Sequence, residues 1–428
     1  MKKQKLNPKS TEFEFFGPIG CTVVMVISPL FLLMQYLICN EEGGCLASPG
    51  YVLGKLVDFK SFYSFKAAGM YFGWLIYHVI MWAVVPGPWV AGTRLRNGNY
   101  VQYKMNAFRI FLITAGLTLA TFLTYGTSPF LAVTQAFPQL VVISITYSAF
   151  QSVVLYMHSF TYENNKLLAL NGNTGVFVHD FWMGRELNPS VFGLDLKEFF
   201  ELRPGLMGWA FLNVCFVVKQ YALLGYSRVT FSILFVAFCQ IGYVADSLYN
   251  QAAVLTTMDI TTDGFGFMLS FGDISFVPFL YPIQTRYLSM YPQELTGLAT
   301  VFLLASASLG YYIFRSANCQ KNDFRRDPND PKLAHLKYIK TDTGRNLLIS
   351  GWWGYASHIN YLGDWLLSLS QCLACGFGSP VPYLFAAYFA VLLVHRDSRD
   401  DHECSKKYGE SWKKYRATVP YRILPYVY

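Results

Sequence analysis

Polar side chains whose spacing could do chemistry appear first inside an apolar run, QIGYVADSLYN. If this run is helical, Tyr243, Asp246 and Asn250 share one face, because they are spaced i, i+3 and i+7. Charged residues at membrane depth are energetically costly and usually functional. We therefore predict that this face is the polar wall of a cavity, where the phenol of Tyr243 can donate a proton. The alternative is a helix that ends near Asp246 and continues as a solvated loop. We favour the cavity for Tyr243. For Asp259 and Asp263 we favour the solvated loop, because TTDG (261–264) is a good turn and cap sequence.

A second set of candidate side chains is basic and lies in the loop 315–359. Lys321 and Arg325 are spaced i, i+4, so on a helix they could grip one phosphate group together. A loop that is basic only because it faces the cytosol would look the same. The spacing alone does not choose between these two interpretations.

The third set is the polar and aromatic C-terminal stretch from Leu347 to Tyr428. His358, Asn360 and Tyr361 could line a ligand site beside a backbone opened by neighbouring glycines. The alternatives are an interfacial belt of aromatic residues and, for the charged tail, a surface helix on anionic lipid. No GxGxxG or Walker motif accompanies these residues, so a soluble nucleotide-binding fold is not indicated. The seven His form no HxxxH or HxxHH cluster, which argues against a metal site of the di-iron oxygenase kind.

The elements that must position these residues are membrane helices. Of 428 residues, 53% are hydrophobic and only 14% are charged, and several apolar runs approach the ~20 residues that cross a bilayer. We predict an all-α polytopic membrane protein with a short basic N-terminus, 1–16, and one membrane domain over 17–428. Its ten candidate spans are 17–39, 64–85, 107–126, 136–158, 205–224, 229–250, 265–286, 294–314, 360–377 and 379–394.

The basic residues predict the orientation in the membrane. With a cytosolic N-terminus, the six cytosolic segments contain 28 of the 34 Lys and Arg residues, which places both termini in the cytosol. No soluble basic domain is evident, and this disfavours nucleic acid as a partner. Cys39 and Cys45 flank a turn on the opposite side, where the sequence leaves a disulfide open.

Longer segments resemble the membrane-bound sterol reductases over nearly the whole chain. DFWMGRELNP (180–189) with LDLKEFFELRPGL (194–206) is similar to the family's central signature. LLISGWWGYASHINYLGDW (347–365) and the segment 395–428 are similar to its two C-terminal signatures. The segment 256–288 resembles the delta-14 branch more than the delta-7 or C-24(28) branches, and NPKSTEFEFFGPIG (7–20) resembles the same branch, especially in fungi.

The resemblance implies a ten-helix enzyme of the endoplasmic reticulum membrane that uses NADPH to reduce the C14=C15 bond of a sterol precursor in ergosterol biosynthesis. An unactivated alkene does not accept hydride directly, so a proton donor in a dry cavity must adjoin the cofactor. The family's catalytic roles would fall on Tyr243 and Asp400, and 315–428 would form most of the cofactor-binding part. Cofactor contacts would fall on Lys321, Arg325, Leu348, Trp353, Asn360, Tyr361, Asp400, Cys404, Ser405, Lys406, Lys407, Tyr408 and Tyr415.

The chain departs from the resemblance at Gln251 and Ala252, where similar sequences usually carry one or two acidic residues. If that acid tunes the proton donor, activity or substrate preference differs here. One rival is another ring or side-chain reductase of the family, which 256–288 disfavours. A second is an isoprenylcysteine-type methyltransferase, which the ten spans and the loop 180–206 disfavour. A nuclear-envelope anchor of the lamin B receptor kind needs a large soluble N-terminal domain, which sixteen residues cannot supply.

Overall fold

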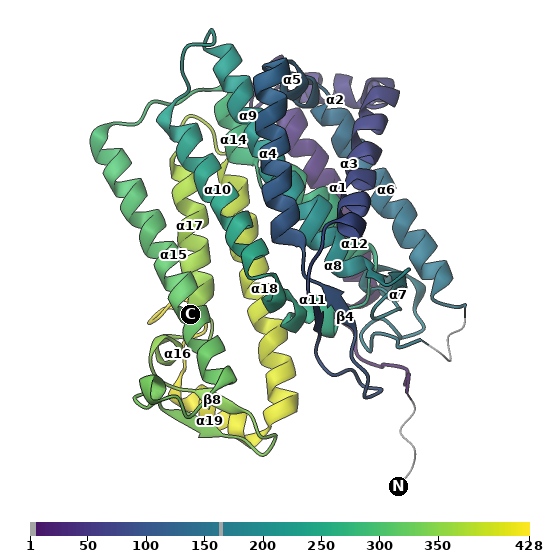
Figure 1. Cartoon of the computed structure of the whole chain (residues 1–428), viewed down its shortest axis with the longest axis vertical. Helices are drawn as coiled ribbons and strands as arrows, with labels where there is room; N and C mark the ends of the chain where they lie inside the picture. Colours follow the sequence, from purple (N-terminus) through teal and green to yellow (C-terminus); the bar gives the residue numbers. More distant parts are fainter. Residues whose placement is uncertain (1–5, 162–165) are drawn as a thin grey trace. The chain divides into compact units, whose positions relative to one another are not determined.

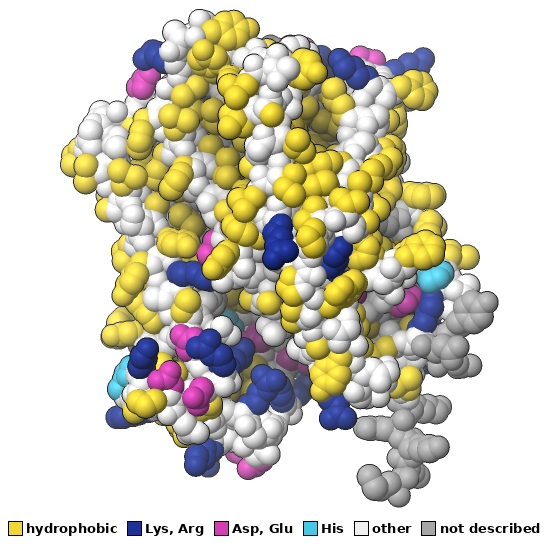
Figure 2. Space-filling model, in the orientation of Figure 1, with side chains coloured by type: hydrophobic (Ala, Val, Ile, Leu, Met, Phe, Trp, Pro, Cys, Tyr) yellow, Lys and Arg dark blue, Asp and Glu magenta, His cyan; other side chains and the backbone are white. Residues whose placement is uncertain are grey.

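The structure is a computed structural model that describes residues 6–161 and 166–428, so Lys2, Lys3 and Lys5 of the basic N-terminus lie outside the described residues. Helices dominate it (Figure 1), and apolar side chains cover much of the surface visible in Figure 2. This confirms an all-α polytopic membrane protein. Seven helices in the described ranges are long and apolar enough to cross a membrane. They are Gly17–Ile38, Lys60–Val84, Ala107–Tyr125, Phe137–His158, Leu196–Leu223, Phe231–Tyr249 and Gly297–Arg326.

The other three predicted spans take different forms, so the count of ten stays a prediction. The last two correspond to α17 (Ile359–Leu373), of 15 residues, and α18 (Tyr383–Tyr408), which continues beyond residue 394. The span predicted over 265–286 is broken near Pro278 and Pro282, which lack the N–H that would continue a helix. Its pieces are α12 (Phe267–Phe271), the π-helical turn η5 (Gly272–Phe276), α13 (Val277–Leu280) and α14 (Ile283–Met290).

The chain divides into two compact units, Met1–Pro292 and Gln293–Tyr428, and each is described by itself. In the first unit α9 packs against α5, α10, α13 and α14. The long helices of this unit are α1 (Gly17–Ile38), α3 (Phe65–Val84), α4 (Ala107–Tyr125), α6 (Phe137–His158), α9 (Leu206–Leu223) and α10 (Phe231–Tyr249). Its short helices are α2 (Pro49–Val57), η1 (Phe59–Phe62), α5 (Ser128–Gln135), α7 (Phe177–Met183), α8 (Leu196–Phe200), η3 (Glu201–Gly205), η4 (Gln251–Thr256) and α11 (Met258–Thr261). Its strand pairs are β1 (Cys39–Asn40) with β2 (Gly44–Cys45), β3 (Trp89–Ala91) with β4 (Gln102–Lys104), and β5 (Ser190–Val191) with β6 (Leu194–Asp195).

Glycines allow two loops of the first unit to cross at backbone distance. A Cβ on Gly184 would overlap the amide nitrogen of Gly266, and a Cβ on Gly264 would overlap the carbonyl oxygen of Gly184. Gly184 also has a φ of 85°, in the left-handed region that favours glycine. The crossing brings the segments 180–189 and 256–288 together, although they are far apart in the sequence.

A buried ion pair fixes the start of α9. Arg203 Nη1 donates to both carboxylate oxygens of Glu198 at 2.8 Å. Its Nη2 donates to the Lys104 carbonyl at 3.0 Å and to Asn106 Oδ1 at 2.7 Å. Arg203 is 0% exposed and Glu198 is 1% exposed. Charges this deeply buried require a partner and hydrogen bonds, so the network ties η3 to β4 and to the start of α4.

Lys197 hydrogen-bonds the backbone of the loop that contains Asp259 and Asp263. Its buried ammonium donates to the carbonyl oxygens of Asp259, Ile260 and Asp263 at 2.8, 3.0 and 2.7 Å. Asn171 Nδ2 also donates to Asp263 Oδ1 at 2.6 Å. The predicted turn is present, but the expectation that this loop is solvated is wrong, because Asp263 is fully buried. Buried carbonyls need donors, and Lys197 supplies three of these bonds.

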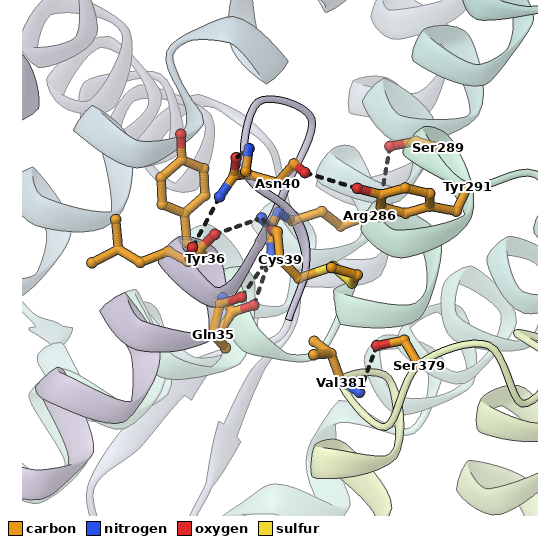
Figure 3. The surroundings of a disulfide bond; sticks show 12 residues. Gln35, Tyr36, Cys39, Asn40, Arg286, Ser289, Tyr291, Ser379 and Val381 are labelled. Atoms are coloured by element: carbon orange, nitrogen blue, oxygen red, sulfur yellow. Dashed lines mark hydrogen bonds between the residues drawn. A yellow bond between two sulfur atoms is a disulfide. The ribbon is translucent and has the colours of Figure 1, made fainter. Parts of the chain in front are cut away.

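Cys39 and Cys45 form a disulfide between β1 and β2, the pairing that the sequence left open. Figure 3 shows Arg286 of α14 beside this disulfide, at the end of α1. Arg286 donates to Gln35 Oε1 at 2.9 Å and to the Cys39 carbonyl. A cation is favourable at the C-terminal end of a helix, where the helix dipole is negative. The end of α1 is therefore held both by Arg286 and by the disulfide.

The second unit is built on α15 (Gly297–Arg326) and α17, which cross at Gly310 and Gly363. A Cβ on Gly310 would lie 2.7 Å from the Gly363 carbonyl oxygen, and such small residues let membrane helices approach closely. Figure 2 shows charged side chains gathered over the end of this unit where Figure 1 labels β8 and α19. The other elements are η6 (Pro331–Leu333), β7 (Tyr338–Lys340), β8 (Asn346–Leu348), α16 (Trp352–Tyr355) and α19 (Glu410–Thr418).

Candidate functional site

The β7–β8 hairpin positions the C-terminal candidate residues, because its two faces pack against different helices. Successive residues of a strand point to opposite sides. Leu348 accordingly packs against Trp353 of α16 and the end of α15. Its neighbour Leu347 packs against the cluster of α19 that contains Tyr415. The hairpin therefore joins α15 and α16 to α19, and the predicted contacts Leu348, Trp353 and Tyr415 are buried in this packing.

Lys321 and Arg325 lie on the last turns of α15, in the helical arrangement that their spacing predicted. Lys321 Nζ lies 4.1 Å from the centre of the Trp353 ring, within cation–π distance. The indole N–H of Trp353 is fixed by donation to the Ala317 carbonyl at 2.9 Å. Arg325 is exposed. One cation is thus held over an aromatic ring while the other is open to an anionic ligand.

Asn360 presents a buried polar atom that no described residue satisfies. Its Nδ2 donates to Asn318 Oδ1 at 3.3 Å, whereas its own Oδ1 is buried and accepts no hydrogen bond in the described part of the chain. A buried acceptor without a donor costs free energy. This oxygen therefore suits an N–H or O–H group of a bound ligand.

A groove of about 460 Å³ lies beside α16. This volume falls within the range of roughly 300–1,000 Å³ that is usual for small-molecule sites. Gly351 leaves room for the Gln320 side chain, because a Cβ at this position would lie 2.6 Å from it. The Oε1 atom of Gln320 accepts the backbone N–H of Trp352 at 2.9 Å. The lining residues are Gln320, Gly351, Trp352, Tyr355, Ile359 and Pro425, none of which is among the predicted cofactor contacts.

His358 lies between two carboxylates of α18. Its Nδ1 is 2.9 Å from Asp397 Oδ1, and its Nε2 is 3.0 Å from Asp400 Oδ2. Burial alone would lower the pKa of His358, but the hydrogen bonds to both carboxylates outweigh burial and raise it. Burial would likewise raise the pKa of Asp400. The hydrogen bond from His358 and the cations Lys321 and Arg325 outweigh that effect and lower it.

The C-terminal tail fixes the inner end of this group. Arg422 Nε lies 3.0 Å from Asp397 Oδ2, and the Tyr428 hydroxyl donates to the same oxygen at 3.2 Å. Arg422 Nη2 also pairs with Asp401 at 2.6 Å. The backbone N–H of His358 donates to the Arg422 carbonyl at 2.7 Å. The tail is therefore part of the site.

The remaining predicted contacts divide into a partly buried group, which includes Cys404 and Tyr408 of α18, and an exposed group. Cys404 packs with the aromatic cluster of α19, and burial together with nearby Asp400 raises the pKa of its thiol to about 12, so it stays neutral. Tyr408 and Tyr415 each stack with Trp412, with ring centroids 6.3 and 4.8 Å from the Trp412 ring. The exposed group consists of Ser405, Lys406 and Lys407.

In the first unit, α10 runs through Tyr249, so Tyr243 and Asp246 lie on one helix as predicted. The alternative in which the helix ends near Asp246 is wrong, because Asn250 ends it and donates from Nδ2 to Asp246 Oδ1 at 3.1 Å. Tyr243 is partly buried, with its ring centroid 5.8 Å from that of Trp209. The phenol therefore lies beside a large apolar ring.

Gln251 has a structural contact. Its Oε1 accepts the N–H of Ala107, the first residue of α4, at 3.0 Å, and the residue is only 9% exposed. The first N–H groups of a helix have no partner within the helix, so Gln251 satisfies one of them. Ala252 is exposed in η4.

The structure brings Lys321, Arg325 and Asp400 close enough for the two cations to act on the carboxylate. Sequence reasoning missed Asp397, although it stands three residues before Asp400 on the same helical face. It also missed Arg422, whose partners lie far away in the sequence and leave no local signal. Among residues 6–161 and 166–428, no group of three or more His, Cys, Asp or Glu could hold a metal ion.

Apolar helices and a polar, aromatic end of the second unit define a multi-pass helical membrane protein with a candidate site for a charged ligand. Residues 9–428 match the sequence model of the Ergosterol biosynthesis ERG4/ERG24 family, and the chain belongs to this family. It is 44% identical to the Delta(14)-sterol reductase erg24 of Schizosaccharomyces pombe, with 100% of both chains covered. It is 39% identical to the Delta(14)-sterol reductase of Neurospora crassa, over 100% of this chain and 98% of that one. Identity to the Delta(14)-sterol reductase LBR of Gallus gallus is 40%, over 98% of this chain and 64% of that one.

Proposed function

We propose that this chain is an NADPH-dependent delta-14 sterol reductase, an oxidoreductase that reduces the C14=C15 bond of a sterol precursor in ergosterol biosynthesis. The observation that carries the proposal is the match of the whole chain, at 44% identity, to a relative named as a Delta(14)-sterol reductase. We propose the endoplasmic reticulum membrane as its location, with both termini in the cytosol. The position of 28 of the 34 basic residues supports this orientation.

The side chains of the second unit fit NADPH. Lys321, Arg325 and Lys407 supply cations that suit its phosphates, and Tyr408 lies beside Lys407, with Nζ 5.2 Å from the ring centre. The buried Oδ1 of Asn360 suits an amide or hydroxyl donor. When bound, NADPH supplies the hydride. The other contacts that we propose are Leu348, Trp353, Tyr361, Asp400, Cys404, Ser405, Lys406 and Tyr415.

Residues of this chain supply the proton. Protonation of C15 leaves a tertiary cation at C14, so a donor must act before the hydride arrives. We assign this role to Tyr243, since its apolar surroundings on α10 limit access of water to the phenol. Asp400 is the second proposed catalytic residue, and its side chain is 39% exposed, so it can exchange protons with solvent.

The test is to incubate the purified protein with NADPH and a delta-8,14 diene sterol, and to measure loss of the diene together with NADPH oxidation. Tyr243→Phe is expected to abolish reduction and to leave NADPH affinity intact. A variant that still reduces the sterol would remove Tyr243 as the donor. Binding of S-adenosylmethionine without binding of NADPH would favour a methyltransferase instead.

Arg325→Ala tests the cofactor assignment separately. A hydrogen bond to a charged group contributes about 1.5–3 kcal/mol, so loss of a phosphate contact should weaken NADPH binding roughly 10- to 100-fold. Arg326→Ala is the matched control, because Arg326 is 76% exposed and pairs with Asp323 at 3.2 Å. Equal affinities in the two variants would mean that the basic loop marks topology only.

A further inference from the structure

The proton count around His358 follows from its two contacts. A neutral imidazole has one donor and one acceptor nitrogen, and an ionised carboxylate can only accept. Both ring nitrogens lie 2.9–3.0 Å from carboxylate oxygens, of Asp397 and Asp400. Two good hydrogen bonds therefore require an additional proton, either on the imidazole or on one of the carboxylates. The trio of Asp397, His358 and Asp400, here named the proton array, holds that proton.

The two ends of the proton array differ in access to solvent. The side chain of Asp397 is 1% exposed and that of His358 is 8% exposed, whereas that of Asp400 is 39% exposed. Arg422 Nε and the Tyr428 hydroxyl lie 3.0 and 3.2 Å from Oδ2 of the inner carboxylate, Asp397, and cover it from the side of the tail. The proton can therefore enter or leave at Asp400, whereas the inner end is closed.

Charged and titratable groups of four helices and of the C-terminal tail surround the proton array. The ring of Tyr361 on α17 stacks on His358 with centroids 4.8 Å apart. Arg416 of α19 donates to Ser357 Oγ at 3.2 Å, next to His358. The groups that face the array are Lys321 and Arg325 from α15, Tyr361 from α17, Asp401 and Cys404 from α18, Tyr415 and Arg416 from α19, and Arg422 and Tyr428 from the tail.

We propose that His358 holds the proton that each turnover consumes and delivers it through Asp400, with Asp397 as the residue that positions the imidazole; this rests on the proposed function. In the delivery step the Nε2–H bond breaks and an O–H bond forms on Asp400 Oδ2. Asp400 then gives up this proton to replace the one that the donor loses to the alkene, and His358 regains a proton from water through Asp400. One proton is used for each alkene reduced, and no additional oxidant or reductant is needed. His358 acts through Asp400 and is not itself a catalytic residue.

The experiment measures kcat, the KM for NADPH and the melting temperature against pH for the full-length protein and its variants. Because the carboxylates raise the pKa of His358, the stability that they contribute is complete below the ordinary value of 6.5 and is lost as pH rises through the raised value. In the unaltered protein, kcat and melting temperature should therefore fall together on the alkaline side. His358→Gln should lower kcat about 10-fold or more, as loss of a proton-transfer group does, and remove this alkaline fall.

Asp397→Asn is the second variant and keeps a titratable imidazole. Loss of one carboxylate should move the alkaline fall of kcat to lower pH while the KM for NADPH changes less than about twofold, which a general structural defect would not do. His402→Gln is the matched control, since His402 is exposed on α18, and its profile should equal that of the unaltered protein.

The outcomes separate the two proposals. An unaltered protein that does not reduce the diene with NADPH would overturn the proposed function, while the pH dependence of melting would still report on the array. If the unaltered protein is active and either variant keeps the original alkaline profile, the role of the array is overturned. Should one variant fail to fold, the profile of the other decides.

Discussion

The buried pair of Arg203 and Glu198 gives the sharpest prediction about stability. Arg203→Met keeps an unbranched apolar stem but leaves the Glu198 carboxylate buried without its cation. The Asn106 amide oxygen and the Lys104 carbonyl also lose a donor, at 2.7 and 3.0 Å. Removal of one partner of a buried pair costs about 3–5 kcal/mol, and the two additional acceptors place the expected loss towards the upper end.

The assay is the free energy of unfolding of the detergent-solubilised protein in a denaturing-detergent titration. The double variant Glu198→Gln with Arg203→Met removes the unpaired charge, and it should recover about 1–2 kcal/mol relative to Arg203→Met. Arg326→Met is the control, because an exposed ion pair contributes less than about 1 kcal/mol. A loss below about 1 kcal/mol for Arg203→Met, or a double variant no more stable than that single one, would refute the account of the pair.

Three further predictions concern the same unit. Lys197→Met should lower the free energy of unfolding by about 3–5 kcal/mol, because three backbone carbonyls lose their donor. A melting temperature equal to that of the parent protein would contradict the hydrogen bonds of Lys197. The peptide that contains Cys39 and Cys45 should take up a thiol-reactive label only after reduction, as measured by mass spectrometry, and labelling without reductant would mean that the disulfide is absent. Gln251→Glu should leave the pH profile of kcat unchanged, because a carboxylate at position 251 can also cap α4; a shifted profile would show that an acid here tunes the proton donor.

Local patterns were enough to predict the membrane helices and the placement of single residues on them. Apolar runs gave seven of the predicted spans, and the i, i+4 spacing correctly put Lys321 and Arg325 on one helix. The span predicted over 265–286 shows where this reasoning reaches its limit. Its average apolarity is that of a span, but two prolines divide it into short helices.

Long-range contacts could not be predicted in the same way. Arg203 finds Asn106 and Lys104 nearly a hundred positions earlier in the chain, and no local period marks that pairing. The same holds for Arg422 and Asp397, which meet only because the tail folds back on α18. The sequence marks such charged residues as candidates, yet only the fold decides whether a charge serves structure or chemistry.

The two residues that we propose as catalytic, Tyr243 of the first unit and Asp400 of the second, have opposite surroundings, and the proposed chemistry gives a reason. Tyr243 packs against apolar side chains, and in the proposed reaction such surroundings would protect a cation formed on the alkene from water. Asp400 stands among cations and hydrogen-bond donors, where charge is stabilised and protons exchange with solvent. Substitutions around Tyr243 should therefore lower turnover with little change in NADPH affinity. Substitutions at Lys321 and Arg325 should instead lower the affinity for NADPH first, and steady-state kinetics measures this contrast.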